Sequence, residues 1–153
     1  MIVVGIDPGL TGAVAKLDNG ELMDLLDMPV YDGRVDARGL YLRLQGWGRP
    51  YMVVIEDVHS MPGQGVASSF KFGRSVGAIE GVVGALSYPH TRLTPQRWKQ
   101  KMGLIGKDKD ASRGMARELH PLYADKFARK KDDGRAEAAL IAEAWRRTNA
   151  NGN

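Results

Sequence analysis

The sequence predicts an α/β protein built on one mixed five-stranded sheet that is covered by helices on both faces. The chain opens with three apolar runs separated only by turns, at residues 1–7, 11–17 and 22–28, and this arrangement predicts an antiparallel meander. Two further apolar runs, at residues 51–55 and 91–93, each follow a stretch with helical periodicity. That order predicts helix-linked parallel strands, which extend the meander into a mixed sheet.

The turns and helices between these runs carry recognisable signals. Pro8-Gly9 ends the first run, and Asn19-Gly20 is a favourable hairpin turn between the second and third. Helices are predicted over residues 36–47 and, after a loop at residues 59–65, over residues 66–86. Further helices follow from Pro95, the last over residues 133–147, and residues 149–153 are expected to fray.

Length and composition narrow the class of protein. The chain has 153 residues, of which 43% are hydrophobic, so we expect a single globular domain over residues 1–153. The absence of cysteine excludes disulfides and thiolate metal sites. The sequence contains no long apolar run and no signal-peptide pattern, so a cytoplasmic location is expected, including the host cytoplasm if the protein comes from a phage.

Positive charge is concentrated in one part of the chain. Residues 92–131 contain 12 Lys or Arg against 4 Asp or Glu, whereas the remainder contains 10 against 14. This asymmetry indicates a polyanion-binding face beside an acidic site. The alternative is a set of solvated helices rich in Lys and Arg.

Carboxylates follow two of the buried strands. Asp7 ends the first apolar run, and Glu56-Asp57 follows the fourth. Carboxylates are seldom buried unless they are paired or bind a metal ion, although Asp-Pro-Gly is also a good turn sequence. If these two strands are neighbours, Asp7 and Glu56 emerge side by side at one edge of the sheet.

A third acidic group lies at the start of the last predicted helix. Asp133 and Glu137 are four residues apart, so they share a helix face and repel each other unless a cation lies between them. Alternatively, Asp132 or Asp133 caps the helix and Glu137 is solvated. Hard oxygen donors favour Mg²⁺ or Mn²⁺, and two such ions about 3.5–4 Å apart can drive phosphodiester hydrolysis.

Several of these motifs together resemble the RuvC-type Holliday junction resolvases, particularly the shorter phage members, over nearly the whole chain. The matching residues are Gly5-Ile6-Asp7-Pro8-Gly9, Gly12, Ile55-Glu56, Ser69, Gly73, Gly77, the segment from Gln96 to Gly103 with Lys107 and Lys109, and Asp133 with Glu137 in an Ala-rich helix.

The resemblance implies a ribonuclease H-like fold, a homodimer, and paired incisions in opposite strands of a four-way DNA junction. It implies metal-binding roles for Asp7, Glu56, Asp133 and Glu137. One departure is that the family's last helix usually presents two Asp three residues apart, whereas here Asp and Glu are four apart with Asp132 adjacent.

The basic segment and the loop after Glu56 supply candidate DNA contacts. Lys109 is expected to stabilise the scissile phosphate electrostatically. By analogy with other apolar wedges in distorted DNA, three residues are candidates for insertion at the junction centre, although Phe70 could equally belong to the core. The candidate wedges are His59, Met61 and Phe70, and the candidate phosphate contacts are Arg97, Lys99, Lys101, Lys107, Lys109 and Arg113.

Four glycines form a stripe along the helix predicted at residues 66–86: Gly73, Gly77, Gly81 and Gly84. Each costs about 1 kcal/mol relative to Ala in a helix interior, so close packing against the stripe is expected in compensation. The partner is either the same helix of a second subunit, which would place two active sites for symmetric cutting, or the chain's own sheet.

Three alternative functions are compatible with the same residues. An actin-like phosphate-binding ATPase shares the fold and a similar opening hairpin, but normally needs two such domains. A non-catalytic junction-binding protein would use the basic segment alone. A related nuclease would act on other branched or RNA-containing substrates.

Overall fold

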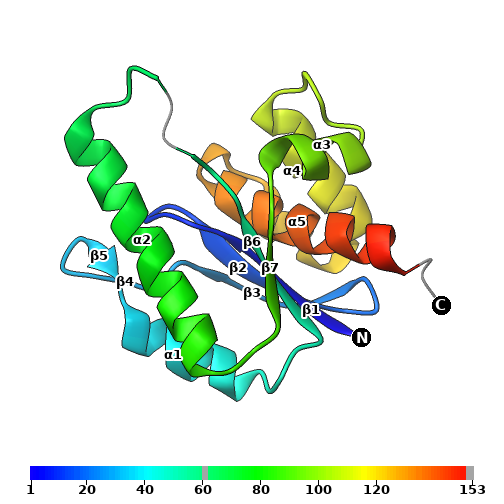
Figure 1. Ribbon diagram of the computed structural model, residues 1–153. Coiled ribbons are helices and arrows are strands. Elements are labelled where there is room, and N and C mark those ends of the chain that lie inside the picture. Colours follow the sequence, from blue (N-terminus) through cyan, green and yellow to red (C-terminus); the bar gives the residue numbers. More distant parts are fainter. Residues whose placement is uncertain (60–61, 151–153) are drawn as a thin grey trace.

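The computed structural model describes residues 1–59 and 62–150. Its main sheet has the strand order β3-β2-β1-β6-β7, in which β1, β2 and β3 are antiparallel and β6 and β7 run parallel to β1 (Figure 1). The predicted mixed five-stranded sheet is therefore confirmed. The strands are β1 (Ile2–Asp7), β2 (Ala13–Asp18), β3 (Glu21–Asp27), β6 (Met52–Glu56) and β7 (His90–Leu93).

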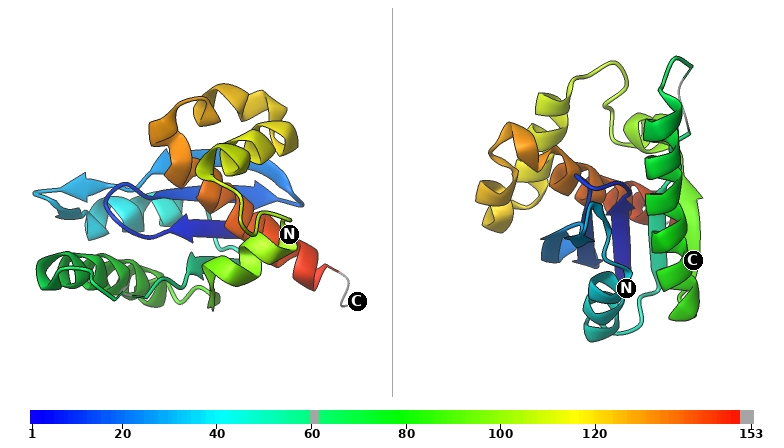
Figure 2. Two further views of the ribbon diagram at one scale, coloured as in Figure 1. Left: turned by 90° about the horizontal axis from the view of Figure 1, so that it is seen from above. Right: turned by 90° about the vertical axis from the view of Figure 1, so that its left-hand side faces the viewer.

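Helices cover both faces of this sheet (Figure 2). α1 (Ala37–Gly46) and α2 (Val66–Ala85) pack on the face formed by Val4, Ile6 and their neighbours, whereas the remaining helices pack on the face of Val3. Successive side chains of a strand point to opposite faces, which explains why the apolar run of β1 serves both layers. The second layer contains α3 (Pro95–Lys101), α4 (Lys109–Leu119), the 3₁₀ helices η1 (Pro121–Phe127) and η2 (Lys130–Asp132), and α5 (Asp133–Asn149).

Helix α5 lies unusually close to the centre of the sheet. A Cβ atom on Gly5 of β1 would lie 2.1 Å from the carbonyl oxygen of Ala138, so only glycine is tolerated at this position. On the helix side the residues that face the sheet are small, and Ala138, Ala139 and Ala142 are fully buried. Glycine on the strand and alanine on the helix together place the first turns of α5 against the end of β1.

A short hairpin between the meander and α1 was not predicted. β4 (Val30–Tyr31) and β5 (Arg34–Val35) pair through the turn Asp32-Gly33, whose residues have φ values of 51° and 67°. Positive φ at both central residues is the signature of a two-residue hairpin turn, for which Asp-Gly is well suited. Strands of two residues are too short to show the alternation that sequence patterns detect.

Among the described residues, no helix combines the length and apolar composition that crossing a membrane requires.

Candidate active site

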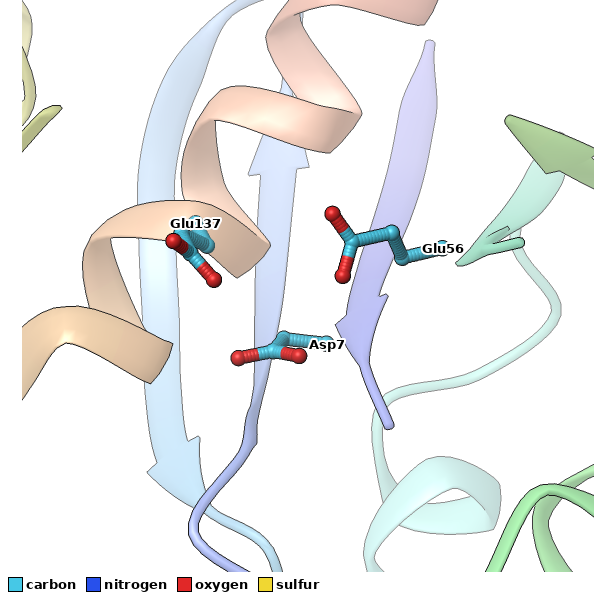
Figure 3. A group of neighbouring side chains, drawn as sticks. All are labelled: Asp7, Glu56 and Glu137. Carbon is cyan, nitrogen blue, oxygen red and sulfur yellow. The ribbon is translucent and has the colours of Figure 1, made fainter. Parts of the chain in front are cut away.

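Three carboxylates meet at one edge of the sheet (Figure 3). Asp7 is the last residue of β1, Glu56 is the last residue of β6, and Glu137 lies in the second turn of α5. One oxygen from each lies within 4.8 Å of the others. The two strands are parallel neighbours with Ile6 opposite Ile55, so both carboxylates emerge at the same level, as expected if the first and fourth predicted strands pair.

The start of α5 reaches this edge because Gly134 has no side chain. A Cβ atom there would lie 2.6 Å from the carbonyl oxygen of Thr11 and 3.2 Å from Oδ2 of Asp7. The first turn of α5 can therefore rest on the turn between β1 and β2. Glu137, one turn later, is only 9% exposed, so the alternative of a solvated Glu137 is wrong.

The three carboxyl groups disfavour one another's charge. Burial raises the pKa of Asp7 well above its ordinary value, and the charges of Glu137 and Glu56 raise it further. Burial also raises the pKa of Glu56 and that of Glu137. Buried like charges this close together are unfavourable without a cation, so the cluster is electrostatically suited to bind one.

Trp98 orients Glu56, a role that is not evident from the sequence. Its fully buried indole donates a hydrogen bond of 2.8 Å from Nε1 to Oε1 of Glu56, which lowers the pKa of that carboxyl and partly offsets burial. Thr94 caps the short helix α3, and Pro95 occupies its first turn. The cap and the buried indole thus tie α3 to the carboxylate cluster.

Lys109 is the cation shared by the cluster. Its Nζ atom lies 3.8 Å from Oε1 of Glu137, and its charge lowers the pKa of Asp7, Glu56 and Glu137. Asp108 accepts a hydrogen bond from the Ala111 N–H and caps α4, so Lys109 begins that helix. The lysine side chain remains 64% exposed, which leaves its ammonium group accessible to a ligand.

The structure places Asp133 beside the cluster rather than inside it. Arg113 forms ion pairs with Asp133 and Asp110 and is itself buried. The charge of Asp133 nevertheless raises the pKa of Asp7 and of Glu137, so it lies near both. Arg113, a candidate phosphate contact, is therefore not on a solvated helix face, because α4 packs on α5 and turns this side chain inward.

Asp132, the neighbouring candidate, has a different role. It is buried, and it accepts hydrogen bonds from the backbone and side-chain nitrogens of Arg129. Arg135 lies 3.5 Å away from the same carboxylate. Neither aspartate accepts a capping hydrogen bond from the first turn of α5, although the Asp132 side chain accepts one from the Arg129 backbone N–H in the capping box of η2. Both aspartates have an arginine partner, but the charge of Asp133 acts on Asp7 and Glu137, so Asp133 is the better candidate ligand.

The other predicted DNA contacts lie on or near the surface. Arg97, Lys101 and Lys107 are exposed, and Lys99 is half-buried with its ammonium 5.3 Å from the centre of the Trp98 ring system. Lys99 also lowers the pKa of Glu56 and Glu137, which places it near the carboxylates.

The predicted wedge residues differ in their surroundings. His59 is exposed, with Nε2 3.6 Å from a carboxylate oxygen of Asp57. Phe70 is 64% exposed, so its assignment to the core is wrong; the Arg74 guanidinium lies 5.7 Å from its ring centre. Met61 lies outside the described residues.

The glycine stripe of α2 faces away from the rest of the chain. Gly73, Gly77, Gly81 and Gly84 are exposed, and a Cβ atom added to any of them would meet nothing within 4 Å among residues 1–59 and 62–150. Packing of the stripe on the chain's own sheet is therefore wrong.

One curated relative is similar to this chain in sequence. No known protein-family profile matches the chain. The chain is 37% identical over 86 residues to the chloroplastic Holliday junction resolvase MOC1 of Chlamydomonas reinhardtii, a match that covers 56% of this chain but 10% of that protein. The chain thus spans a small part of the relative's length.

Solved structures share the fold over almost the whole chain. RuvC of Thermus thermophilus, solved in complex with a Holliday junction substrate, gives a TM-score of 0.67 at 19% identity, covering 97% of this chain and 96% of that chain. The yeast mitochondrial Holliday junction resolvase gives 0.60 at 17% identity, with 97% and 80% covered. The fowlpox virus Holliday junction resolvase gives 0.60 at 15% identity, with 97% and 99% covered. The chain therefore has the RuvC-type, ribonuclease H-like fold.

Proposed function

We propose that this chain is a metal-dependent endonuclease that makes paired, symmetric nicks in four-way DNA junctions. The observation that carries the proposal is the meeting of three buried carboxylates with raised pKa values at the edge of a RuvC-type sheet, next to an accessible lysine. The sequence similarity to a Holliday junction resolvase supports the choice of substrate.

The donor set is suited to Mg²⁺ or Mn²⁺, with two ions per site. Asp7, Glu56 and Glu137 offer only carboxylate oxygens, the donors that these ions prefer. Their mutual repulsion is the feature that a divalent cation would relieve. We assign Asp133 as the fourth ligand, since its charge already acts on two of the other carboxylates, and Arg113 then competes with the cation for it.

The residues around the cluster divide the remaining work of phosphodiester hydrolysis. Bound Mg²⁺ supplies Lewis-acid activation of water and stabilises developing negative charge. Trp98 donates a hydrogen bond to Oε1 of Glu56 and so fixes the orientation of this carboxylate. Lys109 presents an accessible ammonium beside Glu137, where it can stabilise the negative charge of the scissile phosphate.

The DNA backbone would lie along the basic residues Arg97, Lys99, Lys101 and Lys107, which share the layer of α3 and α4 with Lys109. Their charge favours phosphate regardless of sequence. His59, Met61 and Phe70 remain our candidates for the apolar wedge at the junction centre, and the exposure of Phe70 supports its candidacy.

We further propose that α2 packs against α2 of a second copy, so that two sites cut opposite strands. Four exposed glycines in one stripe destabilise a monomer without any contact in return, and they would allow two helix backbones to approach closely. Val66 and Phe70, which are 88% and 64% exposed, continue the same stripe and would add apolar contacts.

The variant Gly77→Ala tests whether α2 packs against a second copy or has no partner. In a monomer the added methyl group stabilises α2 by up to about 1 kcal/mol, because nothing blocks it. In the dimer it holds the two helices apart and weakens association. Light scattering should show a dimer that Gly77→Ala shifts toward monomer, with Gly46→Ala in α1, equally unobstructed, as the control. A wild-type monomer at working concentration would contradict the dimer.

The cleavage reaction can be tested with labelled four-way junction, linear duplex, flap and RNA–DNA hybrid, each with Mg²⁺ or EDTA. We expect symmetric nicks confined to the junction and dependent on Mg²⁺, and Asp7→Asn should abolish cutting while sparing binding. Cutting of flaps or hybrids would instead favour the wider nuclease function. Nucleotide hydrolysis without DNA cleavage would favour the ATPase, and retained cutting by Asp7→Asn would defeat the mechanism.

A further inference from the structure

A small positively charged hollow lies on the side of the sheet away from α3 and α4. It is formed between the β4–β5 hairpin and α2, with a volume of about 100 Å³, and it contains no acidic side chain in its lining. By volume this is room for about three waters, the scale of one phosphate group. The lining residues are Gly33, Arg34, Val35, Lys71, Arg74, Ser75 and Ala78.

Three cations line this hollow without neutralisation by the rest of the described chain. Arg34 comes from the hairpin, and Lys71 and Arg74 come from adjacent turns of α2. None of them forms an ion pair within residues 1–59 and 62–150, whereas Arg92, Arg129 and Arg135 all do. Three exposed cations around one small space give it a positive potential that favours an anion there.

The hollow lies on the part of α2 that approaches the β1–β2 turn. The ring of Phe72 would lie 3.8 Å from a Cβ atom on Gly9, two residues after Asp7. Lys71 and Arg74 are therefore within one turn of the residue by which α2 approaches the β1–β2 turn. The hairpin and α2 pack on one face of the sheet, and α3 and α4 pack on the other. The carboxylates lie at the ends of β1 and β6 and in the second turn of α5.

We propose that this hollow binds a backbone phosphate of the DNA arm that extends from the carboxylate cluster over α2, opposite the contacts made by residues 97–109. The inference rests on the proposed nuclease function. Two guanidinium groups and an ammonium can share the oxygens of one phosphodiester, and guanidinium forks match phosphate geometry. Tyr31 is exposed and pairs with Arg34 in the hairpin, so its ring would lie next to the bound DNA strand.

Arg34→Gln combined with Lys71→Gln tests the site without altering the proposed dimer stripe. Lys71 lies two residues before Gly73, which places it roughly 200° around the helix from that glycine. Both side chains are exposed, so the fold should be retained. Arg49→Gln is the matched control, because Arg49 is exposed, forms no ion pair among the described residues, and precedes β6 at the end opposite Glu56.

Junction affinity should be measured in EDTA across a salt titration, and cutting in Mg²⁺. We expect the double variant to bind several-fold more weakly and to lose about one from the slope of log K against log salt, as for a single phosphate. Each single variant should lose nearly as much as the double, since both residues hold the same phosphate. In cutting, KM should rise while kcat stays unchanged, and Arg49→Gln should match wild type throughout.

Two results would overturn the inference. One is a double variant whose affinity and salt slope equal those of wild type while wild type still cuts junctions. The other is thermal stabilisation of wild type, but not of the double variant, by inorganic phosphate with no difference in DNA affinity, which would identify a free-anion site. If wild type neither binds nor cuts a junction, the proposed nuclease function itself fails, which is a separate outcome.

Discussion

Two buried glutamates on α5 show how differently one helix can treat a carboxylate. Glu137 is 9% exposed and Glu143 is 3% exposed, six residues further along. Burial alone raises the pKa of both, but hydrogen bonds from Arg146 and Arg147 outweigh it at Glu143 and lower its pKa. Glu137 forms an ion pair with Lys109 at 3.8 Å and also feels the charge of Lys99, but neither outweighs burial, and its pKa remains raised.

The direction of the pKa shift distinguishes carboxylates that arginines of the chain neutralise from carboxylates suited to bind a metal ion. Glu143 belongs to a closed network, because two arginines from the next turn supply its countercharge. Asp132 likewise has its countercharge within the chain, from Arg129. In contrast, the charges of Glu137 and Glu56 raise the pKa of Asp7, and the charge of Glu137 raises that of Glu56. Perturbation in this direction is typical of functional sites.

Substitution of Glu137 should give the largest effect. We expect Glu137→Gln to reduce cutting by at least about 100-fold, because metal ions contribute several kcal/mol of charge stabilisation to such reactions. In EDTA the same variant should melt at a higher temperature than wild type, because a buried charge is removed from a like-charged cluster. Glu118→Gln, at an exposed position of α4, is the control for both measurements. A Glu137→Gln protein that cuts normally would remove the distinction between the two glutamates.

Metal binding should reverse the pH dependence of stability. The three raised pKa values mean that the folded, metal-free chain holds protons more tightly than the unfolded chain. Its stability should therefore fall as pH rises from the ordinary carboxyl range, about pH 4, through the raised values. Mg²⁺ at 100 times its dissociation constant should restore about 2.7 kcal/mol near pH 7. Thermal melts with EDTA or Mg²⁺ would show this, and equal Mg²⁺ stabilisation of Asp7→Asn would contradict it.

Glu143→Gln should have the opposite signature to Glu137→Gln. We expect a loss of about 2 kcal/mol in unfolding free energy, less than the roughly 3–5 kcal/mol of a fully buried pair, because both arginines are partly exposed. The lowered pKa of Glu143 means that its contribution is present above the ordinary carboxyl range and is lost as pH falls through the lowered value. Denaturant unfolding measures the loss, and kcat per folded molecule should not change. A fall in kcat would show that Glu143 also serves the active site.

The sequence predicted the strand ends but not the partners of the carboxylates. Apolar runs ending at Asp7 and Glu56 reveal two acids at strand ends, and helix periodicity places Glu137 on a face with Asp133. The hydrogen bond from Trp98 to Glu56 joins residues 42 positions apart, so no local pattern contains it. The five strands, in contrast, could be predicted because each one is marked by a local run of apolar residues.

In the basic segment, too, the sequence does not reveal which charged side chains are buried or paired. Arg113 stands among lysines and arginines that share its composition, and only the packing of α4 on α5 buries it. Asp132 and Asp133 are likewise equivalent in sequence, but Arg129 neutralises one of them and the other reaches the edge of the cluster. The sequence does not bring the cations of the hollow together, because Arg34 lies on a hairpin of two-residue strands that no local pattern predicts.

Trp98→Phe should give the smallest effect, because it removes one neutral hydrogen bond and leaves the Glu56 carboxylate in place. Glu56 is intermediate between Glu137 and Glu143 in how its charge is compensated. One of its oxygens has a neutral donor of its own, and no arginine cancels its charge. Removing the indole N–H should lower Mg²⁺ affinity about tenfold, at the lower end of the effects of such supporting hydrogen bonds, which is about 1.4 kcal/mol. Calorimetric titration of Mg²⁺ measures this directly, and excess Mg²⁺ should restore cutting. Trp145→Phe, on α5 and away from the cluster, is the control for loss of an indole. If excess Mg²⁺ does not restore cutting by Trp98→Phe, the indole acts through packing alone.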